Sequence, residues 1–134
     1  MSALINIDVP DLEAGIDFYT TAFGLSVSRK FGADAVELTG WPSPVYLLRK
    51  DAGTIGAAGQ ARLYTRHWTP VHLDVVVEDI DSAVARATAA GAQLEHGTRI
   101  APYGKIAMLA DPFGHGVCLI EFVGRGYDEL IPAT

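Results

Sequence analysis

A repeat within the chain constrains its fold more than any other sequence feature. The segment LINIDVPDLEAGIDFYTTAFGL begins at Leu4, and the segment HLDVVVEDIDSAVARATAAGAQL begins at His72, 68 residues later. Both run from a strand pattern through an aspartate into a helix pattern that ends near a glycine. Such self-similarity is typical of a fold built from two copies of one supersecondary unit.

Each copy opens with a strand and a capped helix. Ile5, Ile7 and Val9 alternate with other residues, which predicts a strand with one covered face. Asp11 and Asp79 stand directly before the helix patterns, where a carboxylate can accept the unpaired amides of the first turn. Helical spacing predicts that the buried faces consist of Leu12, Ile16, Tyr19 and Phe23 before Gly24, and of Ile80, Val84 and Ala87 before Gly91.

Three strand-like runs follow each helix, so each half reads as strand, helix and three strands. The runs cover residues 25–31, 35–38 and 44–48, and then 93–100, 105–109 and 116–122. We therefore expect an α+β fold of two βαβββ modules in a single domain, residues 1–134. Residues 40–43 and 111–114 predict tight turns before the last strands. The predicted parts are module 1 (about 1–50), a linker (about 51–66), module 2 (about 67–123) and an irregular tail (124–134).

Composition narrows the classes of partner. The formal charge of -6, the pI near 5.0 and the lack of a basic cluster argue against nucleic acid. A single cysteine excludes a disulfide within the chain, and the first residues lack the pattern of a signal peptide. Charged or glycine residues interrupt every apolar stretch before it reaches the roughly 20 residues that a bilayer helix needs. We expect a cytoplasmic protein with no membrane partner.

Two features together carry a resemblance to a known family. The strand–Asp–helix opening occurs twice, and the second half ends in DPFGHGVCLIEF. With two βαβββ halves, the chain resembles the vicinal oxygen chelate superfamily, which includes glyoxalase I, bleomycin-resistance proteins and extradiol dioxygenases. The resemblance implies strands that form an incomplete barrel, a cup that holds a divalent metal in the enzymes and a drug in the binding proteins. It also implies a homodimer.

The resemblance implies four metal-ligand positions on the first and last strands of the modules. His72, seven residues before Asp79, matches the family's metal histidine. Leu4 occupies the corresponding place in module 1 and cannot bind a metal, while Tyr46 and Cys118 stand where a ligand is expected on the last strands. One imidazole, one thiol and one phenol serve a hard divalent ion poorly. We therefore expect the usual metal site to be absent.

Several residues leave alternatives open. Glu121, three residues after Cys118, could complete a site around His72 only if the last strand carried a bulge or shifted by one residue, and a partner subunit could also contribute. We expect Cys118 to pack in the core rather than to act as a nucleophile. His115 is expected to face solvent from its turn, and His67 and His96 are expected at the surface.

The sequence predicts a small-molecule-binding protein without most of the usual metal ligands, for drug or metabolite sequestration. The alternative is a metal-dependent lyase, isomerase or dioxygenase with a non-standard site around His72. A third class, a protein-interaction module, is neither supported nor excluded, and packing of a module or dimer interface is an equal alternative for the aromatic residues. No catalytic residue is assigned, and the cofactor is unknown. The candidate ligand-binding residues are Trp41, Tyr46, Trp68, His72, Asp74 and Cys118, with His72 as the one metal candidate.

Overall fold

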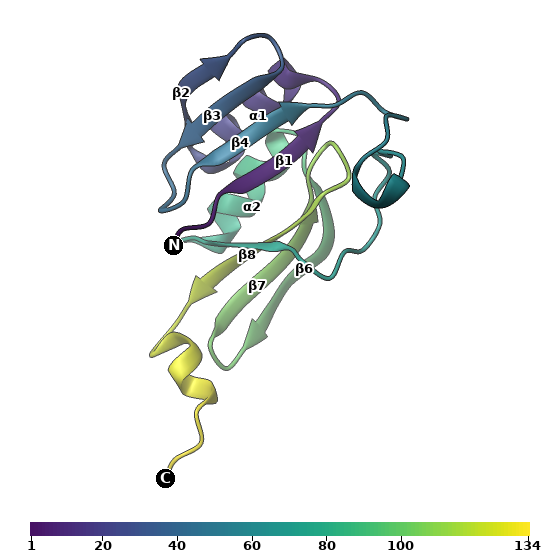
Figure 1. Cartoon of the computed structure of the whole chain (residues 1–134). Coiled ribbons are helices and arrows are strands. Elements are labelled where there is room, and N and C mark those ends of the chain that lie inside the picture. Colours follow the sequence, from purple (N-terminus) through teal and green to yellow (C-terminus); the bar gives the residue numbers. More distant parts are fainter. The chain divides into compact units, whose positions relative to one another are not determined.

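The chain forms two compact units in a computed structural model that describes all residues from 1 to 134. Unit 1 spans Met1–Thr65 and unit 2 spans Arg66–Thr134. Each contains one helix and an open, four-stranded mixed sheet (Figure 1). The predicted α+β fold of two βαβββ modules is confirmed.

Unit 1 follows the predicted order of elements. It contains β1 (Ile5–Val9), α1 (Leu12–Phe23), β2 (Ser26–Phe31), β3 (Ala35–Thr39) and β4 (Val45–Arg49). The sheet order is β1-β4-β3-β2, in which β1 runs parallel to β4 and the other pairs are antiparallel. Helix α1 packs against β2, β3 and β4 and leaves the other sheet face uncovered by a helix of this unit.

Unit 2 repeats this topology. It contains β5 (Leu73–Val76), α2 (Ile80–Ala89), β6 (Gln93–Ala101), β7 (Gly104–Ala110) and β8 (Gly116–Phe122). The sheet order is β5-β8-β7-β6, with β5 parallel to β8. Helix α2 packs against β6, β7 and β8. Strand β6 carries two register irregularities against β7, which no sequence pattern indicates.

Both helices begin at the predicted aspartates. The Asp11 carboxylate accepts a hydrogen bond from the Ala14 amide at 3.0 Å, and the Asp79 carboxylate accepts one from the Ser82 amide at 2.8 Å. Helix α1 ends at Gly24, whose φ of 67° lies in the left-handed region that glycine adopts without strain. The predicted N-caps therefore fix where the helices start.

The helices bury faces rotated slightly from the predicted ones. Ile16 and Phe23 of α1 and Val84 of α2 are only half-buried, and small residues, Gly15, Ala22, Ala83 and Ala87, lie on the buried faces. A Cβ atom on Gly15 would lie 3.2 Å from the Val9 methyl groups, tighter than most real contacts. The buried residues are Leu12, Gly15, Phe18, Tyr19 and Ala22 of α1, and Ile80, Ala83 and Ala87 of α2.

The segment predicted as a linker is folded over much of its length. Residues 51–62 return on themselves: the Gly53 amide donates to the Arg62 carbonyl, the Arg62 amide donates to the Thr54 carbonyl, and Ile55 forms a bridge with Ala61. A short 3-10 helix, η1 (Ala57–Gly59), forms its tip. The Arg62 guanidinium then binds the Asp8 carboxylate of β1 at 2.8 Å. This loop is therefore part of unit 1.

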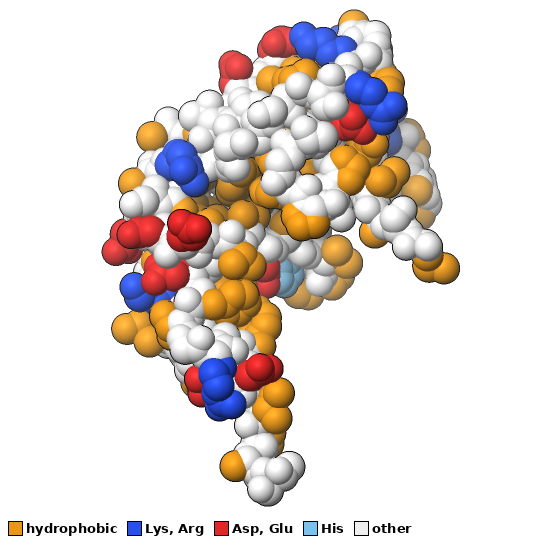
Figure 2. Space-filling model, turned by 90° about the vertical axis from the view of Figure 1, so that its left-hand side faces the viewer, with side chains coloured by type: hydrophobic (Ala, Val, Ile, Leu, Met, Phe, Trp, Pro, Cys, Tyr) orange, Lys and Arg blue, Asp and Glu red, His pale blue; other side chains and the backbone are white.

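The tail, predicted to be irregular, contains a second 3-10 helix, η2 (Gly126–Leu130). The Tyr127 ring packs against Phe122 at 4.8 Å and Tyr103 at 5.0 Å between centroids. Hydrophobic side chains remain exposed along this tail, toward the bottom of Figure 2, among them Leu130 and Ile131. No helix in the structure combines the length and the apolar character that a membrane span requires.

Candidate functional site

Unit 2 encloses a cavity of about 230 Å³ against its sheet. Residues from β5, β6, β7 and β8 line it, together with residues from the segment that leads into β5. Apolar and charged groups are mixed in the lining, as is usual for small-molecule sites. The lining residues are Arg66, Trp68, Thr69, His72, Asp74, Glu95, Arg99, Ile106, Met108, Leu109, Gly116, Val117 and Cys118. We refer to this cavity as the His72 pocket.

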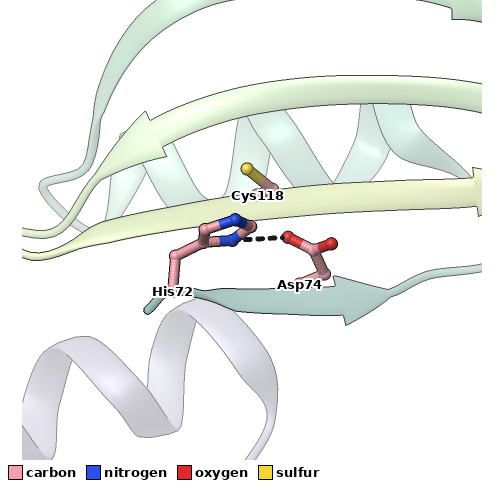
Figure 3. Close-up of side chains that lie close together, drawn as sticks. All are labelled: His72, Asp74 and Cys118. Atoms are coloured by element: carbon pink, nitrogen blue, oxygen red, sulfur yellow. Dashed lines mark hydrogen bonds and ion pairs between the residues drawn. The ribbon is translucent and has the colours of Figure 1, made fainter. Parts of the chain in front are cut away.

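Three of the predicted site residues lie together in the His72 pocket (Figure 3). The His72 Nδ1 and Asp74 Oδ1 atoms are 3.0 Å apart, and Asp74 lies beside Cys118 in the parallel pairing of β5 with β8. One ligand atom from each residue lies within 4.8 Å of the other two. The imidazole is about half exposed, whereas the thiol is buried. The cluster thus presents an imidazole to the pocket, with a carboxylate and a thiol behind it.

The Cys118 thiol is not activated as a nucleophile. Burial raises its pKa to about 11, and the neighbouring Asp74 carboxylate adds to the shift through its negative charge and a hydrogen bond. The thiol is therefore protonated near neutral pH, and a protonated thiol reacts slowly. Core packing, as predicted, accounts for this residue.

An arginine and a glutamate form an ion pair with two hydrogen bonds at the pocket. The Arg66 guanidinium binds the Glu95 carboxylate through two hydrogen bonds of 2.8 and 2.9 Å and also donates to the His67 carbonyl. The ion pair raises the pKa of Arg66 and lowers that of Glu95. A Cβ atom on Gly116 would lie 2.8 Å from Arg66 Nη2, so glycine is what leaves room for this guanidinium.

The two candidate tryptophans, Trp68 and Trp41, lie in different surroundings. Trp68 lines the His72 pocket and is largely exposed, although β5 begins only at Leu73 and does not extend to it. Trp41 belongs to unit 1, where its ring packs on Phe23 at 5.6 Å between centroids. The packing interpretation therefore accounts for Trp41, whereas Trp68 stays a binding candidate.

Tyr46 is held in a polar cluster of unit 1. Its hydroxyl donates to the Glu37 carboxylate at 2.6 Å, and Arg29 donates two hydrogen bonds of 2.9 and 2.7 Å to the same carboxylate. These bonds, chiefly those from Arg29, lower the pKa of Glu37 to about 2, and the bond to Glu37 raises the pKa of Tyr46. Metal coordination by the Tyr46 phenolate is disfavoured, because the hydroxyl would have to give up its proton beside a carboxylate.

Glu121 does not complete a metal site in unit 2. Its Oε2 atom accepts a hydrogen bond of 2.8 Å from the Ile80 amide at the start of α2, and its Oε1 atom lies 3.4 Å from Lys105 Nζ. Strand β8 is paired in regular register with β7, so no bulge turns Glu121 toward Cys118. The carboxylate instead stabilises the N-terminus of α2.

The DPFGHG segment forms the expected turn. The buried Asp111 carboxylate accepts hydrogen bonds from the Phe113 and His115 amides, both at 2.8 Å. The Gly114 amide donates to the Asp111 carbonyl at 3.3 Å, and Gly114 takes a φ of 90°. This aspartate therefore fixes the connection between β7 and β8.

His72, Asp74 and Cys118 also form the one set of donors in unit 2 that could hold a metal ion. An imidazole, a carboxylate and a thiol suit a borderline-soft ion such as Zn²⁺ better than Mg²⁺ or Ca²⁺. Binding would require the thiol to lose its proton, so the affinity would rise with pH. The set fits a three-ligand zinc site, and it differs from the ligand set that the family resemblance implies.

Sequence reasoning missed Arg66, Glu95, Arg99 and Met108. Glu95 and Arg99 lie on β6, where the register irregularities decide which side chains reach the pocket. Arg66 lies in the segment predicted to be a linker. Gly116 was the one sequence feature that could have indicated Arg66, since glycine within a strand often marks the close approach of another group.

Solved structures with the same fold span almost all of the chain. A fosfomycin resistance protein from Listeria monocytogenes is 15% identical, with a TM-score of 0.73 and 98% of each chain covered. A glyoxalase/bleomycin resistance protein/dioxygenase family enzyme from Burkholderia phytofirmans is 19% identical, with a TM-score of 0.68 and 90% and 97% covered. A lactoylglutathione lyase from Agrobacterium tumefaciens is 21% identical, with a TM-score of 0.61 and 90% and 94% covered. At these identities the likeness shows the fold alone.

A family model gives the assignment that these structures cannot. No curated protein matches the sequence significantly. The model of the glyoxalase-like domain matches residues 4–120, which include every strand of both modules except the end of β8. The predicted resemblance to the vicinal oxygen chelate superfamily is therefore confirmed, and the chain belongs to the glyoxalase-like domain family.

Proposed function

We propose that the chain binds a small organic molecule in the His72 pocket. The observation that carries this proposal is a cavity of about 230 Å³ in which apolar residues meet a half-exposed imidazole. Met108 and Ile106 offer an apolar floor, and Trp68 offers an exposed ring that can cover a flat ligand. The fosfomycin resistance protein and the lactoylglutathione lyase share the fold, and their names indicate activities on small molecules.

Sequestration without chemistry is the form of this function that the site residues favour. The Cys118 thiol is protonated at neutral pH, and Tyr46 is bound to Glu37. Neither residue is prepared to act as a nucleophile or as a base. We also propose that the protein works in the cytoplasm, which suits a chain whose single cysteine is a free thiol, and that it forms a homodimer as many relatives do.

A neutral aromatic amide, naphthalene-2-carboxamide, tests the pocket directly. A ligand of its size is expected to bind with a Kd on the order of 1 mM or tighter, at roughly 0.3 kcal/mol per heavy atom. Titration followed by amide NMR shifts should show saturable changes at the pocket residues. Met108→Arg, which places a charged side chain in the cavity, should abolish these changes.

The matched control is Leu63→Arg, an equal change at an exposed leucine of unit 1. This variant should bind as the wild type does. Binding that survives Met108→Arg, or the absence of any saturable shift, would overturn the proposal.

A second candidate function rests on the grouping of His72, Asp74 and Cys118 within 4.8 Å. In this alternative, the three side chains hold Zn²⁺, which supplies Lewis acidity for a lyase or isomerase reaction. Native mass spectrometry should then show about one Zn²⁺ per chain, lost in both His72→Ala and Cys118→Ser. Stoichiometric, His72-dependent binding would favour this alternative over sequestration, and its absence would remove it.

A further inference from the structure

The charged groups that line the His72 pocket differ in whether they already have partners. Arg66 is bound to Glu95, and His72 is bound to Asp74. Arg99 also lines the pocket, yet its guanidinium makes no hydrogen bond or ion pair with any residue of the chain. The pocket therefore contains one cationic side chain whose donors are all available to a ligand.

The sheet order separates Arg99 from Asp74, whereas the other acidic residue of the pocket, Glu95, lies on the same strand as Arg99 and is paired with Arg66. Arg99 lies on β6 at one edge of the sheet, and Asp74 lies on β5 at the other. Three strand spacings separate β5 from β6, a distance of roughly 14 Å at about 4.8 Å each. A ligand of the size of the pocket can therefore meet Arg99 with one end while its other end lies near His72.

The side chains that β7 and β8 contribute between the two edges are apolar, and the Arg66–Glu95 ion pair beside them satisfies its own charges. Ile106 pairs with Arg99 across β6 and β7, and Met108 and Cys118 continue toward β5. These side chains suit the apolar body of a ligand rather than a second charged group. The pocket thus has a cationic end, an apolar middle and an end that offers a carboxylate and an imidazole.

We propose that the ligand of the His72 pocket is a small organic acid whose anionic oxygen group binds Arg99. The planar guanidinium can donate two parallel hydrogen bonds to a carboxylate, phosphonate or phosphate, the shared chemistry of these ligands. Asp74 repels the same group and so sets the direction in which the acid enters. The inference rests on the proposed function, since it names the class of molecule that this pocket accepts.

Two isosteric probes isolate the charge. Naphthalene-2-carboxylate and naphthalene-2-carboxamide have nearly the same shape and differ in the negative charge that Arg99 would bind. At low ionic strength the wild type should bind the carboxylate about tenfold more tightly, and the difference should shrink as salt is added. In Arg99→Gln the two affinities should become equal, with that for the carboxamide unchanged.

The control variant is Arg125→Gln, which removes the same charge from the tail of unit 2, where Arg125 is paired with Glu129. It should keep the tenfold preference. Equal affinities in the wild type, or a preference that persists in Arg99→Gln, would overturn this inference and leave the proposed function standing. If neither probe shows saturable binding to the pocket, both the proposed function and this inference are refuted.

Discussion

Equivalent positions in the two sheets carry side chains of different polarity. In unit 1 the row on β4, β3 and β2 reads Tyr46, Glu37 and Arg29, and these three side chains bind one another. In unit 2 the strands β8 and β7 carry Cys118 and Met108 at the matching places. Thus two apolar sulfur-containing side chains replace a phenol and a carboxylate.

This difference shows why the pocket with available donors lies in unit 2. The cluster in unit 1 satisfies its own hydrogen bonds, so a ligand that used these groups would first have to break them. In unit 2 Met108 and Cys118 occupy the corresponding centre of the sheet, and the charged residues of the pocket come from β5, β6 and the segment before β5. A duplicated scaffold therefore supports two different surfaces.

The largest expected difference between the two units concerns the hairpin glycines. A Cβ atom on Gly104, in the hairpin between β6 and β7, would lie 2.0 Å from the Glu121 carbonyl oxygen, at a φ of +151°. Gly32, in the matching hairpin of unit 1, has a φ of +65° and open space around it. Gly104→Ala should cost more than about 3 kcal/mol, since overlap adds to backbone strain. Gly32→Ala should cost only about 1 to 2 kcal/mol.

Chemical denaturation of both variants checks this prediction. Equal decreases in the free energy of unfolding for the two substitutions would contradict the proposed difference between the two hairpins. Gly97→Ala on β6, where nothing lies within 4 Å, serves as the control and should stay close to the wild type.

The second prediction concerns the only thiol, Cys118. Since its pKa is about 11 instead of the usual 9.0, the fraction of thiolate at pH 8 falls by about 100-fold, and alkylation slows accordingly. Asp74→Asn should speed alkylation several-fold, because it removes a negative charge that raises the pKa. Mass spectrometry after iodoacetamide treatment measures both rates.

The urea-unfolded protein provides the reference rate for this experiment. A native rate equal to that in urea would contradict the raised pKa. If Asp74→Asn leaves the native rate unchanged, the thiol is suppressed by burial alone, and the coupling between Asp74 and Cys118 is refuted.

The smallest expected effect is the contribution of Glu37, in unit 1, to the pH dependence of stability in acid. The pKa of Glu37 is about 2 in the folded chain, against an ordinary value of 4.5. A carboxyl group with a lowered folded pKa contributes stability above pH 4.5 and loses it as the pH falls toward 2. Because the Arg29 side chain is largely exposed, solvent screens the pair and keeps the contribution small.

Thermal unfolding of Glu37→Gln between pH 6 and pH 3 tests this contribution. The variant should have a lower Tm than the wild type at pH 6, and the gap should narrow as the pH falls. Glu78→Gln, an exposed position, should follow the wild type at every pH. A gap that is constant with pH would mean that Glu37 stabilises unit 1 by packing rather than by its charge.

Much of the fold could be predicted because its signals are local. An aspartate before an apolar helical pattern caps a helix wherever the chain folds, and Asp11 and Asp79 do so in the structure. Alternation along β1 likewise depends on neighbours two residues apart. The buried faces of the helices were less well predicted, since they depend on how closely Gly15 lets α1 approach the sheet.

The site was predicted only in part. His72, Asp74 and Cys118 were candidates because they lie on the strands that open and close module 2, and the structure brings them together. The pairing of Tyr46 with Glu37 could not be foreseen, because it joins two strands through their register. Likewise, no local pattern connects Arg66 with Glu95, which lies 29 residues further along the chain.

The sequence by itself determined the duplicated βαβββ scaffold, the helix caps and the divergence of the expected metal positions, since these follow from periodicity and spacing. The tertiary structure alone decided which polar groups are free to bind a ligand. A guanidinium such as that of Arg66 or Arg99 becomes paired or stays available according to which strands lie beside it. Hydrogen bonds and ion pairs act over a few ångströms in space, and the sequence does not record that distance.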